Sequence, residues 1–301
     1  MDNDKKIIKN AKQLIKKMKF KLDYKDLKIF PENAGNEILY ELLNADTPFM
    51  VCRAGATEMR CIEEYLKNRD FSSKIKQEIW ELSGVFPPEK KLLKKFCDYY
   101  IRCMENADLI ALWGVGAESK VVHEHCSKAK FTVLHALEPY YFEKPWSRGL
   151  KQKKVLVIHP FIDSIKSQYL KRKKIYTRKE ILPEFESLEC IKAVQSIAGQ
   201  KTEYRDWFEA LESMQNKISK CDFDVAIIGA GAYSLPLAAY VKKIGKQSIQ
   251  MSGATQILFG IKGKRWDNHP VISKFYNDDW VRPLQSEKPL KTEKVEGGSY
   301  W

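Results

Sequence analysis

The sequence predicts an α/β protein with a Rossmann-like, mostly parallel sheet that helices cover on both faces. Short apolar runs end at a glycine or a polar turn, as "DVAIIGAG" does at 224–231, and segments with helical spacing follow most of them. Strands that alternate with helices in this way are typical of a parallel sheet that helices cover. A chain of 301 residues with 44% hydrophobic content is long enough for one such domain with additions.

The predicted elements follow one another along the chain in this alternating order. Strands are predicted at 47–55, 107–114, 131–137, 153–161, 223–231 and 246–253. Helices are predicted at 57–68, at 163–176, at 202–220 and at 234–245, with two helical patterns within 74–106 that "GVFPPE" separates. We expect the chain to divide into a basic amphipathic helical extension at 1–45, a single Rossmann-like domain at 46–285 and a polar tail at 286–301.

Charge and cysteine content limit the classes of partner and compartment. The formal net charge of +13 favours anionic partners such as nucleotides, nucleic acid or an acidic membrane surface. The seven cysteines include no CxxC pair, and we interpret them as reduced, buried thiols of a cytosolic protein. No apolar run is long enough to span a membrane, and no signal-peptide segment is recognisable at the N-terminus.

The N-terminal helix predicted at 4–20 has an apolar stripe and a lysine-rich remainder. The stripe is formed by Ile7, Ile8, Ala11, Leu14, Ile15 and Met18. One interpretation is a helix packed on the domain with a solvated basic face. The other is an interfacial helix that touches an anionic lipid surface.

The stretch "AIIGAGAYSL" at 226–235 has the form of a phosphate-binding turn between a strand and a helix. Its candidate binding residues are Gly229, Gly231, Tyr233 and Ser234. A dinucleotide fingerprint needs an acid about 20 residues further on, at the end of the next strand. Gln250 and Ser252 stand there instead, so a phosphate or diphosphate is the better guess. A tight turn without any ligand remains the alternative.

The turn "CRAGATE" places Arg53, Gly55 and Glu58 between a strand and a helix. Arg53 suits bidentate recognition of a phosphate or carboxylate. Glu58 should lie in the first helical turn. It could act as a base, act as a metal ligand, or only be a charge that the helix dipole favours.

Two further segments carry candidate site residues. The loop "QILFGIKGKRWDNHP" at 256–270 contains Gln256, Lys264, Arg265 and Trp266, which could clamp a diphosphate and stack on a base. A solvated charge run is the alternative. His159 at a strand end could be an acid/base or a phosphate donor, or a structural histidine.

Metal-binding patterns are weak in this sequence. His123 and His125 flank Glu124 without a third ligand at recognisable spacing. Asp278 and Asp279 are interpreted as a turn or helix cap, with a paired-carboxylate metal site as the alternative.

In a parallel sheet ligands bind beyond the carboxyl ends of the strands. Those ends carry "RAGATE", "WGVGAES", "ALEPYY", "HPFIDS", "GAGAYS" and "GATQ".

In "RAGATE" and in residues 224–253 the chain resembles the GT-D-type glycosyltransferases of bacterial surface-glycan and glycoprotein assembly. In that family an early strand ends in an R-aromatic-G-D-G-E turn, whose D-x-E part serves the metal and the donor diphosphate. Arg53, Gly55 and Glu58 match the turn. Ala56 and Thr57 replace its Asp and second Gly. The resemblance implies a Mn or Mg cofactor, with weaker metal dependence than is usual in the family.

The resulting hypothesis is a sugar transferase that uses a nucleotide-sugar donor and a growing glycan or lipid-linked glycan acceptor. Glu58 or His159 would be the base, and Lys264 and Arg265 would stabilise the leaving diphosphate. The rivals are a NAD(P)- or S-adenosylmethionine-dependent Rossmann enzyme and a non-enzymatic nucleic-acid binder. We do not expect a nucleic-acid partner, because no recognised binding motif occurs. The hypothesis locates the protein in the cytoplasm, either free or on the inner face of the membrane.

Overall fold

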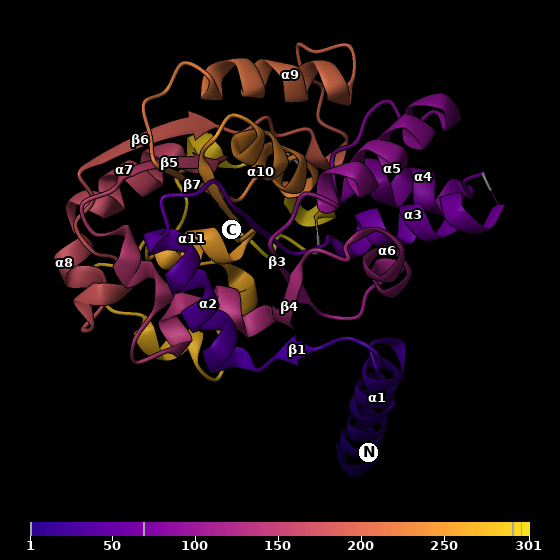
Figure 1. The fold of residues 1–301 in the computed structure, drawn as a ribbon, viewed down its shortest axis with the longest axis horizontal. Coiled ribbons are helices and arrows are strands. Elements are labelled where there is room, and N and C mark those ends of the chain that lie inside the picture. The colour runs from indigo at the N-terminus through magenta and orange to yellow at the C-terminus, as the bar shows by residue number, and fades with distance from the viewer. Residues whose placement is uncertain (1, 69, 291, 296) are drawn as a thin grey trace.

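A computed structural model describes residues 2–68, 70–290, 292–295 and 297–301 of the chain (Figure 1). Its strands are β1 (Ile29–Phe30), β2 (Met50–Cys52), β3 (Leu109–Leu112), β4 (Lys130–Val133), β5 (Lys154–His159), β6 (Ser187–Lys192), β7 (Val225–Ile228) and β8 (Gln247–Gln250). Its helices are α1 (Asp2–Asp23), α2 (Glu32–Asn44), α3 (Ala56–Asn68), α4 (Ser73–Glu81), α5 (Lys90–Met104), α6 (Glu118–His125), α7 (Ile162–Leu170), α8 (Arg172–Ile175), α9 (Trp207–Ile218), α10 (Ser234–Lys243) and α11 (Ala254–Leu258).

The strands form one eight-stranded sheet in the order β1-β4-β3-β2-β8-β7-β5-β6. Every pairing is parallel, so all carboxyl ends lie at the same edge of the sheet. The two central strands, β2 and β8, are separated by almost two hundred residues of sequence, yet Val51 pairs with Ile249. The predicted fold class, a parallel sheet covered by helices, is confirmed.

Two apolar cores lie on opposite faces of the sheet. Successive residues of one strand enter different cores because side chains alternate across a strand. In β2, Met50 and Cys52 belong to the core under α3, α5 and α10, whereas Val51 belongs to the core under α2 and α7. Both faces of the sheet are therefore buried, which explains why the strands are continuous apolar runs.

Several boundaries differ from the sequence-based expectation. β1 pairs with β4, and α2 buries Leu39 and Leu43 in one of the two cores, so residues 29–44 pack as part of the sheet's own body. β6 was not predicted, because its polar residues Glu189 and Lys192 interrupt the apolar pattern of an edge strand. The single helix predicted at 163–176 is two helices, α7 and α8. The strand predicted at 131–137 ends at Val133 and continues as a 3₁₀ turn.

The two ends of the chain behave differently. Figure 1 shows α1 standing off the body with the N-terminus at its free end. Within the described ranges, no helix combines the length and the apolar character needed to cross a bilayer. The tail packs back on the domain, since Glu287 and Val295 are buried.

All seven cysteines are free thiols, five of them buried, as the sequence analysis expected of reduced cysteines.

Candidate functional site

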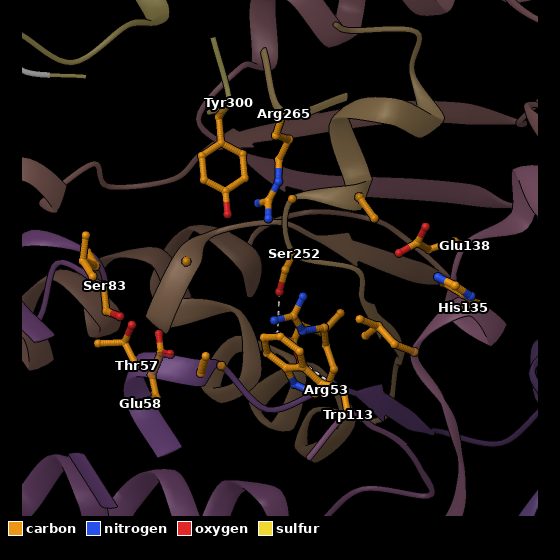
Figure 2. Close-up of a pocket in the computed structure, with 18 of the residues that line it drawn as sticks. Arg53, Thr57, Glu58, Ser83, Trp113, His135, Glu138, Ser252, Arg265 and Tyr300 are labelled. Carbon is orange, nitrogen blue, oxygen red and sulfur yellow. Dashed lines mark hydrogen bonds between the residues drawn. The ribbon is translucent and has the colours of Figure 1, made fainter. Parts of the chain in front are cut away.

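A pocket of about 450 Å³ lies beyond the carboxyl ends of five strands that are neighbours in the sheet, β4, β3, β2, β8 and β7. Its size is that of a small-molecule site. Figure 2 shows Thr57, Glu58 and Ser83 on one side of it and His135 and Glu138 on the other. Arg53, Trp113 and Ser252 lie between these walls, and Arg265 and Tyr300 face them from the loops that follow β8.

Glu58 lies in the first turn of α3, as predicted, and its carboxyl group forms part of the pocket wall. The residue is only 7% exposed. Burial raises the pKa of this carboxyl group. Hydrogen bonds from its own backbone N–H and from the Ser83 hydroxyl, and the charge of Arg53, oppose that rise. A Cβ atom at Gly55 would lie 1.9 Å from Oε2 of Glu58. Gly55 therefore makes the space into which the carboxyl group folds.

Arg53 follows β2 and is held by its surroundings. Its backbone N–H donates to Oε1 of Gln250 at 2.9 Å, which ties the ends of β2 and β8 together. Its guanidinium lies over the Trp113 ring, 4.5 Å from the ring centroid. The indole N–H of Trp113 donates to the carbonyl oxygen of Ala54 at 2.9 Å. This packing directs the guanidinium along the pocket, where an anion would meet a planar fork of donors.

Arg265 belongs to the basic loop after β8 and meets the pocket from the opposite direction. Its guanidinium lies 5.2 Å from the centroid of Trp266 and 5.1 Å from that of Tyr300. Its backbone N–H donates to the carbonyl oxygen of Ser299 at 3.0 Å. The C-terminal tail therefore completes this wall, and Tyr300 is part of the pocket.

The side of the pocket that His135 and Glu138 form follows β4. Glu138 accepts a hydrogen bond from the Tyr140 hydroxyl at 3.0 Å. Burial raises the pKa of the Glu138 carboxyl group, while His135, Arg53 and Arg265 oppose that rise electrostatically. The positive charge of Arg53 therefore opposes the rise in pKa of both carboxyl groups, Glu58 and Glu138. Nδ1 of His269 accepts two backbone N–H bonds, and burial lowers the pKa of this histidine.

The glycine turn contributes one residue to the pocket. Gly231 lines it with a left-handed φ of +57°, and a Cβ there would have only the Ser83 carbonyl oxygen within 4 Å, at 3.9 Å. A Cβ at Gly229 would lie 2.6 Å from the His159 ring and 2.6 Å from the Ser252 carbonyl oxygen. Gly229 therefore allows close packing of β7 against its neighbours.

The remaining candidates of this turn lie behind the pocket wall. The Ser234 hydroxyl accepts the backbone N–H of Ala230 at 2.7 Å. The Tyr233 ring stacks on Trp207 with its hydroxyl 3.0 Å from that of Ser196. Both side chains are buried, and neither lines the pocket.

Three other candidates are also placed outside the pocket lining. His159 is 3% exposed, and its Nδ1 accepts the backbone N–H of Phe161 at 3.0 Å. Burial lowers its pKa to about 3, so the imidazole is neutral at physiological pH. The buried side chain of Gln256 donates to the carbonyl oxygens of Ile261, Lys262 and Tyr300. Lys264 is exposed, with Nζ 3.4 Å from the Gly297 carbonyl oxygen.

Several pocket residues were not singled out from the sequence. They share no local motif and come from six separate segments: Ser83, Tyr100, Trp113, His135, Glu138, His269 and Tyr300. Trp113 lies near the end of one predicted strand, at 107–114, and Glu138 follows another, at 131–137, so the rule that ligands bind at strand ends gave a signal for both. Nothing in the sequence pattern indicates that Tyr300 returns to the site.

The predicted metal patterns are not gathered into a site. His123 bonds to the Ser119 carbonyl oxygen at 2.7 Å, and His125 lies 2.8 Å from Glu105. The backbone N–H of Asp279 donates to the Asn277 side chain at 2.9 Å, in keeping with the predicted turn. Over the part of the chain that the structure describes, no group of three His, Cys, Asp or Glu side chains is placed to hold a metal ion.

Comparison of the chain with protein-family models, with curated proteins and with solved structures finds no match. The fold itself is established by the structure. The chain is an α/β protein on an eight-stranded, all-parallel sheet, Rossmann-like in character, and no family is identified.

Proposed function

We propose that the pocket binds a nucleotide-sugar and that the protein transfers the sugar to a glycan or lipid-linked glycan acceptor, as a glycosyltransferase of the GT-D type. The observation that carries the proposal is the meeting of Arg53 and Arg265 in one pocket with the buried carboxyl group of Glu58. The two arginines are over two hundred residues apart and come from two loops at the same sheet edge.

The arginines suit the diphosphate of a donor. Two guanidinium groups that enter the pocket from opposite directions provide charge-assisted hydrogen bonds where negative charge grows as the leaving group departs. Trp266 and Tyr300 lie beside Arg265 with their ring centroids 6.1 Å apart, so an aromatic surface is available for the base. In this proposal Arg265 and Arg53 take the role that the sequence analysis gave to Lys264 and Arg265.

Glu58 suits the role of base. In the transfer, the acceptor hydroxyl gives its proton to the Glu58 carboxylate while its oxygen forms the new bond to the anomeric carbon. The bond from that carbon to the diphosphate breaks, and the nucleoside diphosphate leaves with the additional negative charge. The raised pKa of the Glu58 carboxyl group makes its carboxylate a stronger base than that of an exposed glutamate.

The residues near Glu58 do not fit a metal ion held by the protein. Ala56 carries no ligand atom where the family turn has aspartate, and the Glu58 carboxyl group already accepts from its own backbone N–H and from Ser83. The proposed mechanism therefore has no step through a metal. Chelation during ligand titration tests whether a Mn or Mg ion arrives with the diphosphate.

Two observations weigh against the rival functions. The space beside Gly229 is filled by His159 and Ser252, and the end of β8 presents Gln250 and Ser252 rather than an acid for a ribose. For a nucleic-acid binder, the pocket is a poor fit, because it contains the two carboxyl groups of Glu58 and Glu138 beside its arginines.

A ligand screen tests the proposal. UDP-, GDP-, CMP- and dTDP-sugars, NAD, S-adenosylmethionine and an oligonucleotide are compared by thermal shift, and the nucleotide sugars are followed for slow hydrolysis. We expect one nucleotide-sugar to stabilise the protein and to be hydrolysed slowly. Stabilisation by NAD or S-adenosylmethionine alone, or salt-sensitive oligonucleotide binding without any nucleotide-sugar effect, would overturn the proposal.

A further inference from the structure

The outer part of α1 carries apolar side chains that the protein itself does not cover. Leu14, Ile15, Met18 and Leu22 are 57–68% exposed. Positions 14, 18 and 22 repeat every fourth residue and position 15 lies beside them, so the four form one stripe along the helix. The side chains of residues 1–10, 12 and 13, with Ile7 and Ile8 among them, lie outside what the structure describes.

The opposite side of the same helix attaches it to the body. Phe20 packs against Tyr24, with ring centroids 4.6 Å apart, and against the turn at Gly114. Residues two apart on a helix point about 200° apart, so the attachment side at Phe20 is opposite to Met18 and Leu22. The stripe therefore points away from the domain. The described part of the predicted stripe, Leu14, Ile15 and Met18, is therefore not packed on the domain.

Lysines border this stripe. Lys16, Lys17, Lys19 and Lys21 are exposed, and residues 14–22 contain no acidic side chain. A helix with an outward apolar stripe between cationic side chains matches a negatively charged bilayer surface, where the stripe enters the headgroup region and the lysines meet lipid phosphates.

We propose that α1 is a membrane-docking helix whose stripe, Leu14, Ile15, Met18 and Leu22, binds the surface of an anionic bilayer. A second copy of the chain would be a poorer occupant, because the sequence has eight lysines and no acid between residues 5 and 22, and pairing two such helices would bring like charges together. The proposal does not depend on the proposed function.

The base of α1 is joined to the pocket through hydrogen bonds. The Tyr24 hydroxyl donates to Oε2 of the buried Glu118 at 2.6 Å. The same oxygen accepts the backbone N–H groups of Trp113 and Gly114 at 3.1 and 2.7 Å. Trp113 supports Arg53, so a docked helix would hold the domain at a fixed place relative to the membrane through the wall that contains Arg53.

Vesicle flotation of the full chain tests this proposal. The vesicles are phosphatidylcholine alone or phosphatidylcholine mixed with phosphatidylglycerol. We expect wild type to float with the anionic vesicles, to a lesser extent at high salt, and to stay behind with the neutral ones. The triple variant Ile15→Gln, Met18→Gln, Leu22→Gln should bind at least about tenfold more weakly, because the apolar stripe is lost. Glutamine keeps the helix propensity.

Two matched controls, one for apolar side chains and one for lysines, test whether the effects are specific to α1. Leu170→Gln with Leu290→Gln removes two apolar side chains elsewhere that are more exposed than those of the stripe, and it should leave flotation unchanged. The adjacent pair Lys16→Gln, Lys17→Gln should weaken binding by about fivefold per lysine. The exposed pair Lys173→Gln, Lys174→Gln on α8 should have little effect.

Three results would overturn the proposal. Wild type that does not float with anionic vesicles is the first, and a triple variant that floats as well as wild type is the second. The third is self-association in sedimentation velocity without lipid that the triple variant abolishes, together with no vesicle binding. That result would assign the stripe to a second copy. Each result is independent of whether a nucleotide-sugar binds in the pocket.

Discussion

Burial of the Glu58 carboxyl group in the candidate site links its ionisation to the stability of the fold. Its carboxyl group is buried in the turn that Gly55 opens, so ionisation is disfavoured in the folded protein relative to the unfolded chain. With the folded pKa above the unfolded one, stability falls as pH rises from the ordinary carboxyl pKa through the raised one. Above that range the ionised group destabilises the fold.

We therefore predict that Glu58→Gln unfolds at a temperature at least as high as wild type at pH 7, while turnover falls by about 10²–10⁴-fold. The difference in melting temperature should shrink as pH drops below the raised pKa. Thermal melts across pH and a turnover assay measure both effects. Glu63 in the same helix, with its side chain 39% exposed, gives the control Glu63→Gln. Equal turnover in the Glu58 variant would exclude the role of base.

At this scale the sequence was informative where a site is local. Arg53, Gly55 and Glu58 lie within six residues, so a strand–turn–helix pattern was enough to predict that they lie together. His159 illustrates the opposite case. Its position after a strand resembles that of the pocket residues, but β5 lies outside the five strands that meet the pocket. Only the order of strands in the sheet separates the two cases.

At the scale of elements, the two glycines of the turn between β7 and α10 have different structural roles. Gly229 provides the space for packing against His159 and Ser252, whereas Gly231 faces the pocket. The sequence pattern marks both glycines alike. The difference arises from tertiary contacts, because His159 and Ser252 come from the neighbouring strands β5 and β8.

Alanine at each glycine should separate these functions. Gly229→Ala should strongly lower the melting temperature, because the methyl group meets backbone and ring atoms that cannot move freely. Gly231→Ala should cost only about 1–2 kcal/mol for the left-handed φ. It should also weaken binding of a nucleoside diphosphate out of proportion, because the methyl group enters the pocket. Thermal melts and calorimetric titration measure the two effects. An unchanged dissociation constant for Gly231→Ala would mean that the turn is only structural.

The two strands that were not predicted, β1 and β6, both lie at edges of the sheet. β1 consists of two residues, too short for any periodicity to appear. β6 lies at the sheet edge, where exposed polar residues are tolerated and the apolar run breaks. A continuous apolar run marks a strand buried on both faces, so the six central strands were predicted and the two edge strands were not.

At the scale of the whole molecule, the site exists because the strand order brings distant segments to one edge. β2, early in the chain, pairs with β8, late in the chain, and Arg53 and Arg265 thereby face one cavity. The parallel sheet and the rule for strand ends could be predicted from sequence. The strand order and the return of the tail with Tyr300 could not, because both depend on pairings between residues that no local pattern links.

The proposed function requires that Arg53 and Arg265 together bind a diphosphate. Calorimetric titration of wild type, Arg53→Gln and Arg265→Gln with UDP and GDP, in buffer with EDTA, tests it most directly. The matched control is Arg205→Gln, which removes an exposed arginine paired with Glu209 at 3.2 Å. We predict binding of at least one nucleotide by wild type and the control, and a loss of about tenfold or more in affinity for each pocket variant, since a charge-assisted hydrogen bond contributes about 1.5–3 kcal/mol. Unchanged affinity in both pocket variants, or no binding of either nucleotide by wild type with or without added manganese, would contradict the account.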